Sequence, residues 1–96
     1  MSKSNMPTKA EYHKQICAVL NEMYRAKNAD YGDAYALLRK EYPMSICWRL
    51  SDKLNRLKTL YATDAEKPNW VSESITDTLM DVANYAIMEL IERGTE

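Results

Sequence analysis

Three carboxylates near the C-terminus, Glu73, Asp77 and Asp81, follow one another at a strict four-residue step. On an α-helix, at about 100° per residue, this step places them along one stripe. Neighbours of like charge at this spacing repel by a few tenths of a kcal/mol, roughly, per pair. No lysine or arginine lies between Ser72 and Arg93 to offset them. This acidic ladder therefore predicts a cation from elsewhere, either a metal ion or basic side chains on a neighbouring helix.

Two interpretations of the acidic ladder stay open. In the first, it binds Mg²⁺, which prefers oxygen ligands and shares them with substrate phosphates. We then expect Asp52, from an earlier helix, to join Glu73, Asp77 and Asp81 as metal ligands, with Asp52, Glu73 and Asp77 catalytic. In the second, the ladder is a solvated acidic face whose first carboxylate is stabilised by the helix dipole. The stripe borders the apolar face of its helix, and Asn84 extends it. Both features favour a metal-binding site over a solvated face.

Basic residues gather in an earlier segment, where Arg49, Lys53 and Arg56 lie with Asp52 within an arc of about 100° on a predicted helix. Guanidinium and ammonium groups bind phosphates, so we predict that this cationic set, Arg49, Lys53 and Arg56, holds the phosphates of a nucleotide. The alternative is salt bridges to the acidic ladder across a helix interface. Both interpretations are compatible, since one basic side chain can serve a carboxylate and a phosphate.

The segment from Lys27 to Asp33 is a third candidate. Its side chains Lys27, Asp30 and Tyr31 are polar groups that could contact a ligand. The alternative is a plain connection between helices, in which Gly32 ends one helix and Asp33 caps the next.

Tyrosine usage is unusual, because the chain has seven tyrosines and no phenylalanine. A tyrosine ring stacks on other rings and offers a hydroxyl, which suits a nucleobase pocket or a wet oligomer interface. We expect Tyr31, Tyr35 and Tyr85 to lie near a site. His13 has no partner at triad or metal spacing, and no glycine-rich loop predicts a P-loop.

Helix signals predict an all-α bundle of three long helices and one short helix, in a single domain at 8–94 after a flexible leader at 1–7. Thr8 and Glu11 fit a capping box. The helices are expected at 8–30, 33–42, 45–61 (or from 44) and 72–94 (or from 69). Their predicted core residues are Ile16, Val19, Leu20, Met23, Ile46, Leu50, Leu54, Leu57, Tyr61, Ile75, Leu79, Val82, Ala86 and Leu90. Four helices of this length leave one bundle face open, so we expect a homodimer or larger homo-oligomer to complete it.

Composition and charge limit the kinds of binding partner and the cell compartment that we expect for this protein. A net charge of −1 disfavours general attraction to DNA or RNA. The N-terminus has no signal-peptide pattern and no segment approaches 18 apolar residues, so we expect neither secretion nor a membrane partner. Cys17 and Cys47 form no CxxC motif and are expected to be reduced, buried thiols of a cytoplasmic protein.

Three segments, KNADYGDAY (27–35), RLSDKLNRLKTL (49–60) and ESITDTLMDVANYAIM (73–88), together resemble the nucleotide modification associated domain 1 proteins, a group common in phage genomes. That group is similar to the MazG-like all-α nucleotide pyrophosphohydrolases. The resemblance implies Mg²⁺-dependent cleavage of a nucleoside triphosphate to a monophosphate and pyrophosphate, in the cytoplasm of the host cell if the protein is phage-encoded.

This chain departs from the MazG-like pattern of two acid pairs on two helices. Asp81 matches the final acid and Asp77 lies close to the first, but Thr78 occupies the usual glutamate position. On the earlier helix, Asp52 and Asn55 stand where two acids are expected. The leading hypothesis is a Mg²⁺-dependent pyrophosphohydrolase. Under it, phosphates are held by Lys27, Lys53 and Arg56, and the base or sugar pocket is shaped with the help of Asp30, Tyr31 and Asn84. The alternatives are an anti-defence protein that sequesters a cyclic or ADP-ribose-derived host-defence signal without cleaving it, and a purely structural helical oligomer.

Overall fold

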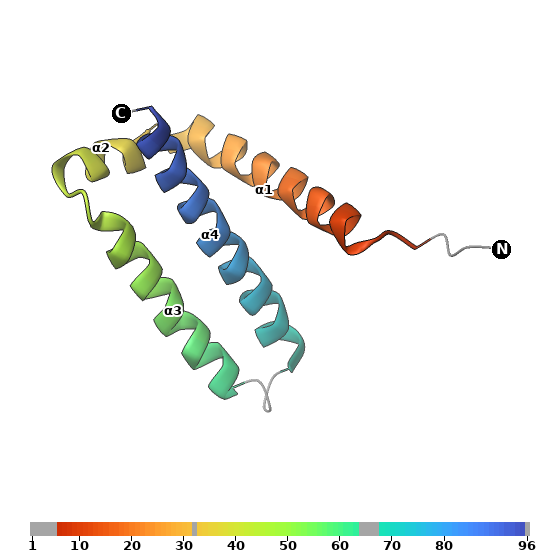
Figure 1. The fold of residues 1–96 in the computed structure, drawn as a ribbon. Helices are drawn as coiled ribbons and strands as arrows, with labels where there is room; N and C mark the ends of the chain where they lie inside the picture. Colours follow the sequence, from red (N-terminus) through yellow and green to blue (C-terminus); the bar gives the residue numbers. More distant parts are fainter. Residues whose placement is uncertain (1–5, 32, 64–67, 96) are drawn as a thin grey trace. The chain divides into compact units, whose positions relative to one another are not determined.

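The computed structural model describes residues 6–31, 33–63 and 68–95, with the side chains of 29–31 and 68–71 left out (Figure 1). All regular structure within these residues is helical, which confirms the all-α prediction. The helices are α1 (Lys9–Tyr31), α2 (Ala34–Glu41), α3 (Ser45–Thr63) and α4 (Pro68–Gly94). With 8 residues α2 is the short helix, against 23, 19 and 27 for the others. Most of the predicted leader at 1–7 lies outside the described residues.

The helix termini confirm some of the predicted signals. The Thr8 backbone N–H donates to Glu11 Oε1 at 2.6 Å, and the Glu11 N–H donates to Thr8 Oγ1 at 3.1 Å, so the capping box forms. Asp33 occupies the N-cap of α2, but its side chain makes no capping hydrogen bond, which corrects the predicted role. Gly32 lies outside the described residues. α4 starts earlier than expected, at Pro68, because proline suits the first turn of a helix.

The chain divides into two compact units, Met1–Gly32 with α1 and Asp33–Glu96 with the other three helices. In the second unit, α3 and α4 run antiparallel side by side, and α2 lies at the end where α3 begins and α4 finishes (Figure 1). This hairpin of two long helices positions the predicted charged residues. A single domain at 8–94, completed by oligomerisation, stays a prediction.

The α3–α4 contact follows the predicted apolar stripes only in part, since Leu50, Leu57, Ile75 and Val82 are partly buried. Leu54 and Tyr61 of α3 are 52% and 62% exposed, and Leu90 of α4 is 66% exposed. Leu60 and Thr78 are buried instead. Lys53, which pairs with α4, and Leu60 lie seven residues apart and therefore about 20° apart around α3. The two helices thus meet along the border between the apolar and the cationic stripe of α3.

Other predicted burial also needs correction. In α1, Leu20 is buried as predicted, whereas Ile16 and Val19 were expected in the core and are exposed. Cys17 and Cys47 are free and exposed, so the prediction of buried thiols is wrong. No helix in the described part of the chain is long and apolar enough to cross a membrane.

Candidate functional site

The cationic set and the acidic ladder meet across the α3–α4 contact. Lys53 Nζ lies 3.1 Å from Asp81 Oδ2, with both side chains about a quarter exposed. Arg56 Nε donates to Thr78 Oγ1 at 3.3 Å, and Thr78 Oγ1 donates to the backbone oxygen of Ser74 at 2.7 Å. The predicted alternative of a salt bridge to the acidic ladder is therefore formed at one of its three carboxylates, Asp81. An ion pair this exposed contributes about 1 kcal/mol or less.

The other two carboxylates of the acidic ladder lie at an open pocket. Glu73 and Asp77 are exposed and line a shallow pocket of about 210 Å³ together with Ser72 and Thr76. Neither carboxylate has a hydrogen bond or ion pair to a residue that the structure describes. Carboxylate and hydroxyl oxygens one helical turn apart form a polar surface that suits a hard cation.

The four predicted metal ligands do not form one cluster. Among the described residues, no group of three His, Cys, Asp or Glu side chains stands close enough to hold a metal ion. Asp81 is engaged by Lys53, and Asp52 is exposed on α3. Two carboxylates, Glu73 and Asp77, fit Mg²⁺, since this ion commonly takes one or two protein carboxylates and completes its shell with water and substrate phosphates. Metal binding itself stays a prediction.

The predicted nucleotide-binding residues divide between the two units. Arg49, Lys53, Arg56 and Asn84 belong to the second unit, and Asn84 is half-buried. Lys27 is an exposed residue of α1 in the first unit. The side chains of Asp30 and Tyr31 are among those that the structure does not describe. The candidate site is therefore built from the second-unit residues alone.

Two of the three singled-out tyrosines come together beside the cationic set. The ring centroids of Tyr35 and Tyr85 are 6.1 Å apart, and the Arg49 guanidinium carbon lies 5.9 Å from the Tyr85 centroid. This is the range of a cation–π contact, which orients the guanidinium above the ring. Arg49 is exposed and keeps its hydrogen-bond donors available to a ligand.

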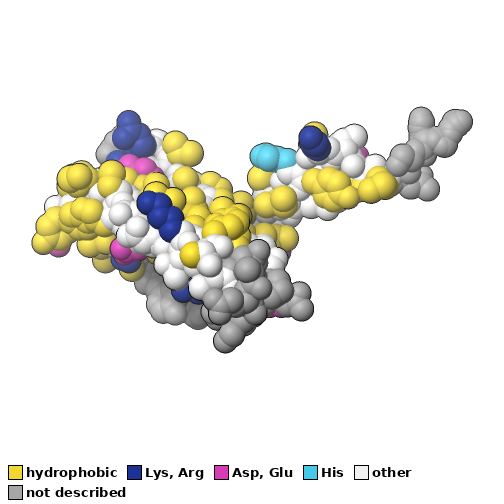
Figure 2. Space-filling model, turned by 90° about the horizontal axis from the view of Figure 1, so that it is seen from below, with side chains coloured by type: hydrophobic (Ala, Val, Ile, Leu, Met, Phe, Trp, Pro, Cys, Tyr) yellow, Lys and Arg dark blue, Asp and Glu magenta, His cyan; other side chains and the backbone are white. Residues whose placement is uncertain are grey.

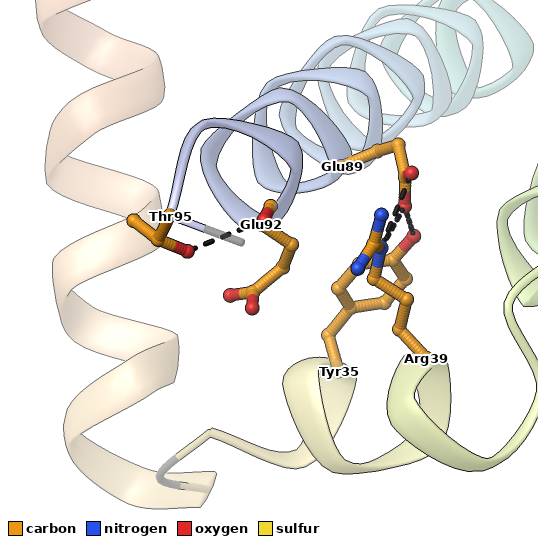
Figure 3. A network of polar contacts seen from close by, with 5 residues as sticks. All are labelled: Tyr35, Arg39, Glu89, Glu92 and Thr95. Carbon is orange, nitrogen blue, oxygen red and sulfur yellow. Dashed lines mark hydrogen bonds and ion pairs between the residues drawn. The ribbon is translucent and has the colours of Figure 1, made fainter.

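Sequence reasoning missed a polar cluster that attaches α2 to α4. Tyr35 Oη donates to Glu89 Oε1 at 2.6 Å, while Arg39 Nε donates to the two Glu89 oxygens at 3.0 and 3.2 Å (Figure 3). The side chains of Arg39 and Glu89 are each 14% exposed. We call Tyr35, Arg39 and Glu89 the α2 clamp. Its signal was present in the sequence, because Tyr35 and Arg39 stand one helical turn apart and Glu89 lies two turns beyond Asp81.

The clamp shifts the ionisation of its members. Hydrogen bonds from Arg39 and then from Tyr35 lower the pKa of Glu89 below its ordinary value of 4.5. Burial, together with the hydrogen bond to the Glu89 carboxylate, raises the pKa of Tyr35 to about 12. At pH values between these two pKa values, the α2 clamp therefore pairs an ionised Glu89 carboxylate with a neutral Tyr35 phenol.

We expect the stabilising contribution of the α2 clamp to be lost at both acid and alkaline pH. The pKa of Glu89 is depressed on folding, so its contribution exists above pH 4.5 and is lost as pH falls through the folded value. The pKa of Tyr35 is raised, so its contribution exists below pH 10 and is lost as pH rises towards about 12. At pH 7, Glu89→Gln should lower the free energy of unfolding by about 2 kcal/mol and Tyr35→Phe by about 1 kcal/mol.

Denaturant unfolding from pH 3 to 11 measures both effects. Glu89→Gln should flatten the acid limb of the stability profile, and Tyr35→Phe the alkaline limb. Unchanged acid and alkaline limbs in the respective variants would contradict the assignment of these titrations to the clamp.

The described residues thus define an all-α protein in which a cationic helix packs against an acidic one. The family model described as nucleotide modification associated domain 1 matches residues 27–92, more than half of the chain, and the chain belongs to this family. No curated protein and no solved structure gives a significant match.

Proposed function

We propose that this protein binds a nucleotide on the α3–α4 surface and, with Mg²⁺, cleaves a nucleoside triphosphate to a monophosphate and pyrophosphate. One observation carries the proposal. Lys53 and Arg56 contact α4 at Asp81 and Thr78, while Asp77, one turn from Asp81, has no partner among the described residues. Phosphate-binding cations and two available carboxylates, Glu73 and Asp77, therefore share one helix pair. Family membership supports a nucleotide ligand.

Each residue has a role in this proposal. Arg56 and Lys53 bind phosphate oxygens, and Arg49, oriented by Tyr85, supplies a further cation. Glu73 and Asp77 would hold Mg²⁺, which when bound neutralises phosphate charge and makes a coordinated water more acidic. Thr78 keeps Arg56 directed along α4, because its hydroxyl accepts the Nε–H.

Pyrophosphate release from a panel of ribonucleoside and deoxyribonucleoside triphosphates, measured with Mg²⁺ and with Mn²⁺, tests the proposal. We expect metal-dependent release from at least one nucleotide. No turnover of any nucleotide at high protein concentration would remove the hydrolase proposal.

The Lys53–Asp81 ion pair favours a second candidate, binding without cleavage. A cation that neutralises an acid of the ladder reduces the number of carboxylates available to metal. The ligand would then be a nucleotide-derived signal, for example a cyclic or ADP-ribose-derived molecule, sequestered intact. Its binding should raise the melting temperature with concentration, as ligand linkage requires, and chromatography should recover the ligand unchanged.

Both candidates predict that Lys53→Met weakens nucleotide binding by about tenfold, since it removes a charge-assisted contact to phosphate. Lys58→Met is the matched control, because Lys58 is an exposed lysine of the same helix. Calorimetric titration with a bound nucleotide measures both dissociation constants. Equal affinities in the two variants would show that Lys53 serves only the salt bridge to Asp81.

A further inference from the structure

The α3–α4 helix pair has different chemistry at its two ends. Tyr85 continues the acidic ladder, because it follows Asp81 at the same four-residue step. Asp77 and Tyr85 are eight residues apart on α4, so they lie about 12 Å apart along its axis and within about 80° around it. A carboxylate that the proposed function assigns to Mg²⁺ and an aromatic ring therefore share one side of α4, with the ring nearer α2.

The cationic set meets α4 at successive levels in antiparallel register. Its three contacts are Arg49 at Tyr85, Lys53 at Asp81 and Arg56 at Thr78. Successive cations are four and three residues apart on α3, and their partners are four and three residues apart on α4. Arg56 is therefore the cation at the level of the Glu73–Asp77 pocket, and Arg49 lies about 10 Å from it along α3.

The Arg49 guanidinium is held by aromatic rings rather than by a carboxylate. Its carbon lies 5.9 Å from the Tyr85 ring centroid, and the Tyr35 ring lies 6.1 Å from Tyr85 with its hydroxyl bonded to Glu89. Figure 2 likewise shows Lys and Arg side chains (dark blue) beside hydrophobic ones (yellow). Arg49 is exposed and makes no hydrogen bond or ion pair to a residue that the structure describes. Its N–H donors and planar face are therefore preorganised for a ligand.

We propose that the Arg49–Tyr85 end of the helix pair binds the nucleobase, so that the nucleotide lies along α3 and α4 with its phosphates towards Arg56. This inference rests on the proposed nucleotide function and gives that site a direction. Mg²⁺ shares its oxygen ligands between carboxylates and phosphates, so phosphates bound beside Glu73 and Asp77 lie at the Arg56 end and leave the other end to the nucleoside.

The two residues at the base end have separate roles. A guanidinium stacks on a base and donates to its carbonyl and ring-nitrogen acceptors, so Arg49 contacts the base. Tyr85 is a positioning residue, because it acts by holding the Arg49 guanidinium in place.

Calorimetric titration of the full chain with Mg²⁺ and two kinds of probe tests the direction. The α,β-methylene ribonucleoside and deoxyribonucleoside triphosphates carry a base and resist cleavage, whereas inorganic triphosphate carries no base. Arg49→Met should weaken the tightest-binding nucleotide analogue by about tenfold and leave the affinity for inorganic triphosphate unchanged. Arg56→Met is the matched change at the other end and should weaken the binding of both probes. Triphosphate binding also reports that each variant is folded.

Two further variants separate a base contact from a simple charge. Arg49→Lys keeps the charge but loses the planar fork that stacks and donates, so it should bind the nucleotide analogue nearly as weakly as Arg49→Met. Tyr85→Leu should also weaken only the nucleotide analogue. Its combination with Arg49→Met should cost little more than Arg49→Met alone, because both changes remove the same contact.

The outcomes distinguish this inference from the proposed function. Wild-type nucleotide affinity in Arg49→Met, an equal loss of both probes in that variant, or rescue by Arg49→Lys overturns the direction of binding and leaves nucleotide binding standing. If no nucleotide analogue binds the wild-type chain, the proposed function fails and the direction fails with it. A nucleotide that binds as expected but is never cleaved removes hydrolysis alone.

Discussion

The Asp77→Asn variant is expected to lose Mg²⁺-dependent nucleotide turnover by on the order of 100-fold, because it removes the charge of one of two proposed metal ligands. Its fold should not suffer. Asp77 is exposed and has no partner among the described residues, so neutralising it relieves repulsion along the acidic ladder by a few tenths of a kcal/mol, roughly. Activity and stability therefore move in opposite directions in the same variant.

Two measurements check this result. Initial rates of pyrophosphate release give the loss of turnover, and melting curves with and without Mg²⁺ give the loss of metal-dependent stabilisation. Asp33→Asn is the matched control, since Asp33 is exposed and its side chain makes no capping hydrogen bond. Full turnover in Asp77→Asn would exclude Asp77 as a metal ligand. A protein that binds nucleotide without metal would show the gain in stability but no Mg²⁺ effect in either variant.

Replacing Leu60 with alanine is expected to lower the free energy of unfolding by about 3 kcal/mol, the range for a buried leucine. Leu60 is 5% exposed and lies on the side of α3 that faces α4. Few described side chains share this degree of burial, and two of them, Ser45 and Thr78, are polar. We therefore expect the α3–α4 contact to depend on Leu60 more than on Leu54, an exposed residue of the predicted apolar stripe.

Urea unfolding followed by circular dichroism measures the effect of this replacement. Leu54→Ala, the same change at a half-exposed position of the same helix, should cost less than about 0.5 kcal/mol. Equal destabilisation by the two variants would mean that Leu54 is as well packed as Leu60, and that the predicted stripe, rather than its border, forms the contact.

Local signals in the sequence placed the helices well. The Thr8–Glu11 capping box, the break before Pro43 and the end at Gly94 all act within one turn of chain, and each appears where expected. The rotation of each helix about its axis was predicted less well. Leu60 and Thr78 are buried although they were not predicted as core residues, while the predicted core residues Leu54 and Leu90 are exposed. An apolar stripe tells which side of a helix avoids water but not which partner helix meets its edge.

The candidate site shows the same division. The sequence located the acidic ladder and the cationic set, and left open whether metal or basic side chains offset the carboxylates. The structure answers this for one rung, because Lys53 pairs with Asp81, while Glu73 and Asp77 line the open pocket. The α2 clamp was not predicted, since it joins residues 50 and more positions apart.

The sequence by itself determined the all-α class, the helix order and the family, since helix propensity, capping and motif order are properties of short stretches of chain. Only the tertiary structure decided which charges meet and which stay available. The physical reason is that ion pairs and buried contacts form between side chains far apart in sequence, and the packing of α3 against α4 fixes those distances. Asp81 and Asp77 are the same residue type one turn apart, yet only Asp81 lies within reach of Lys53.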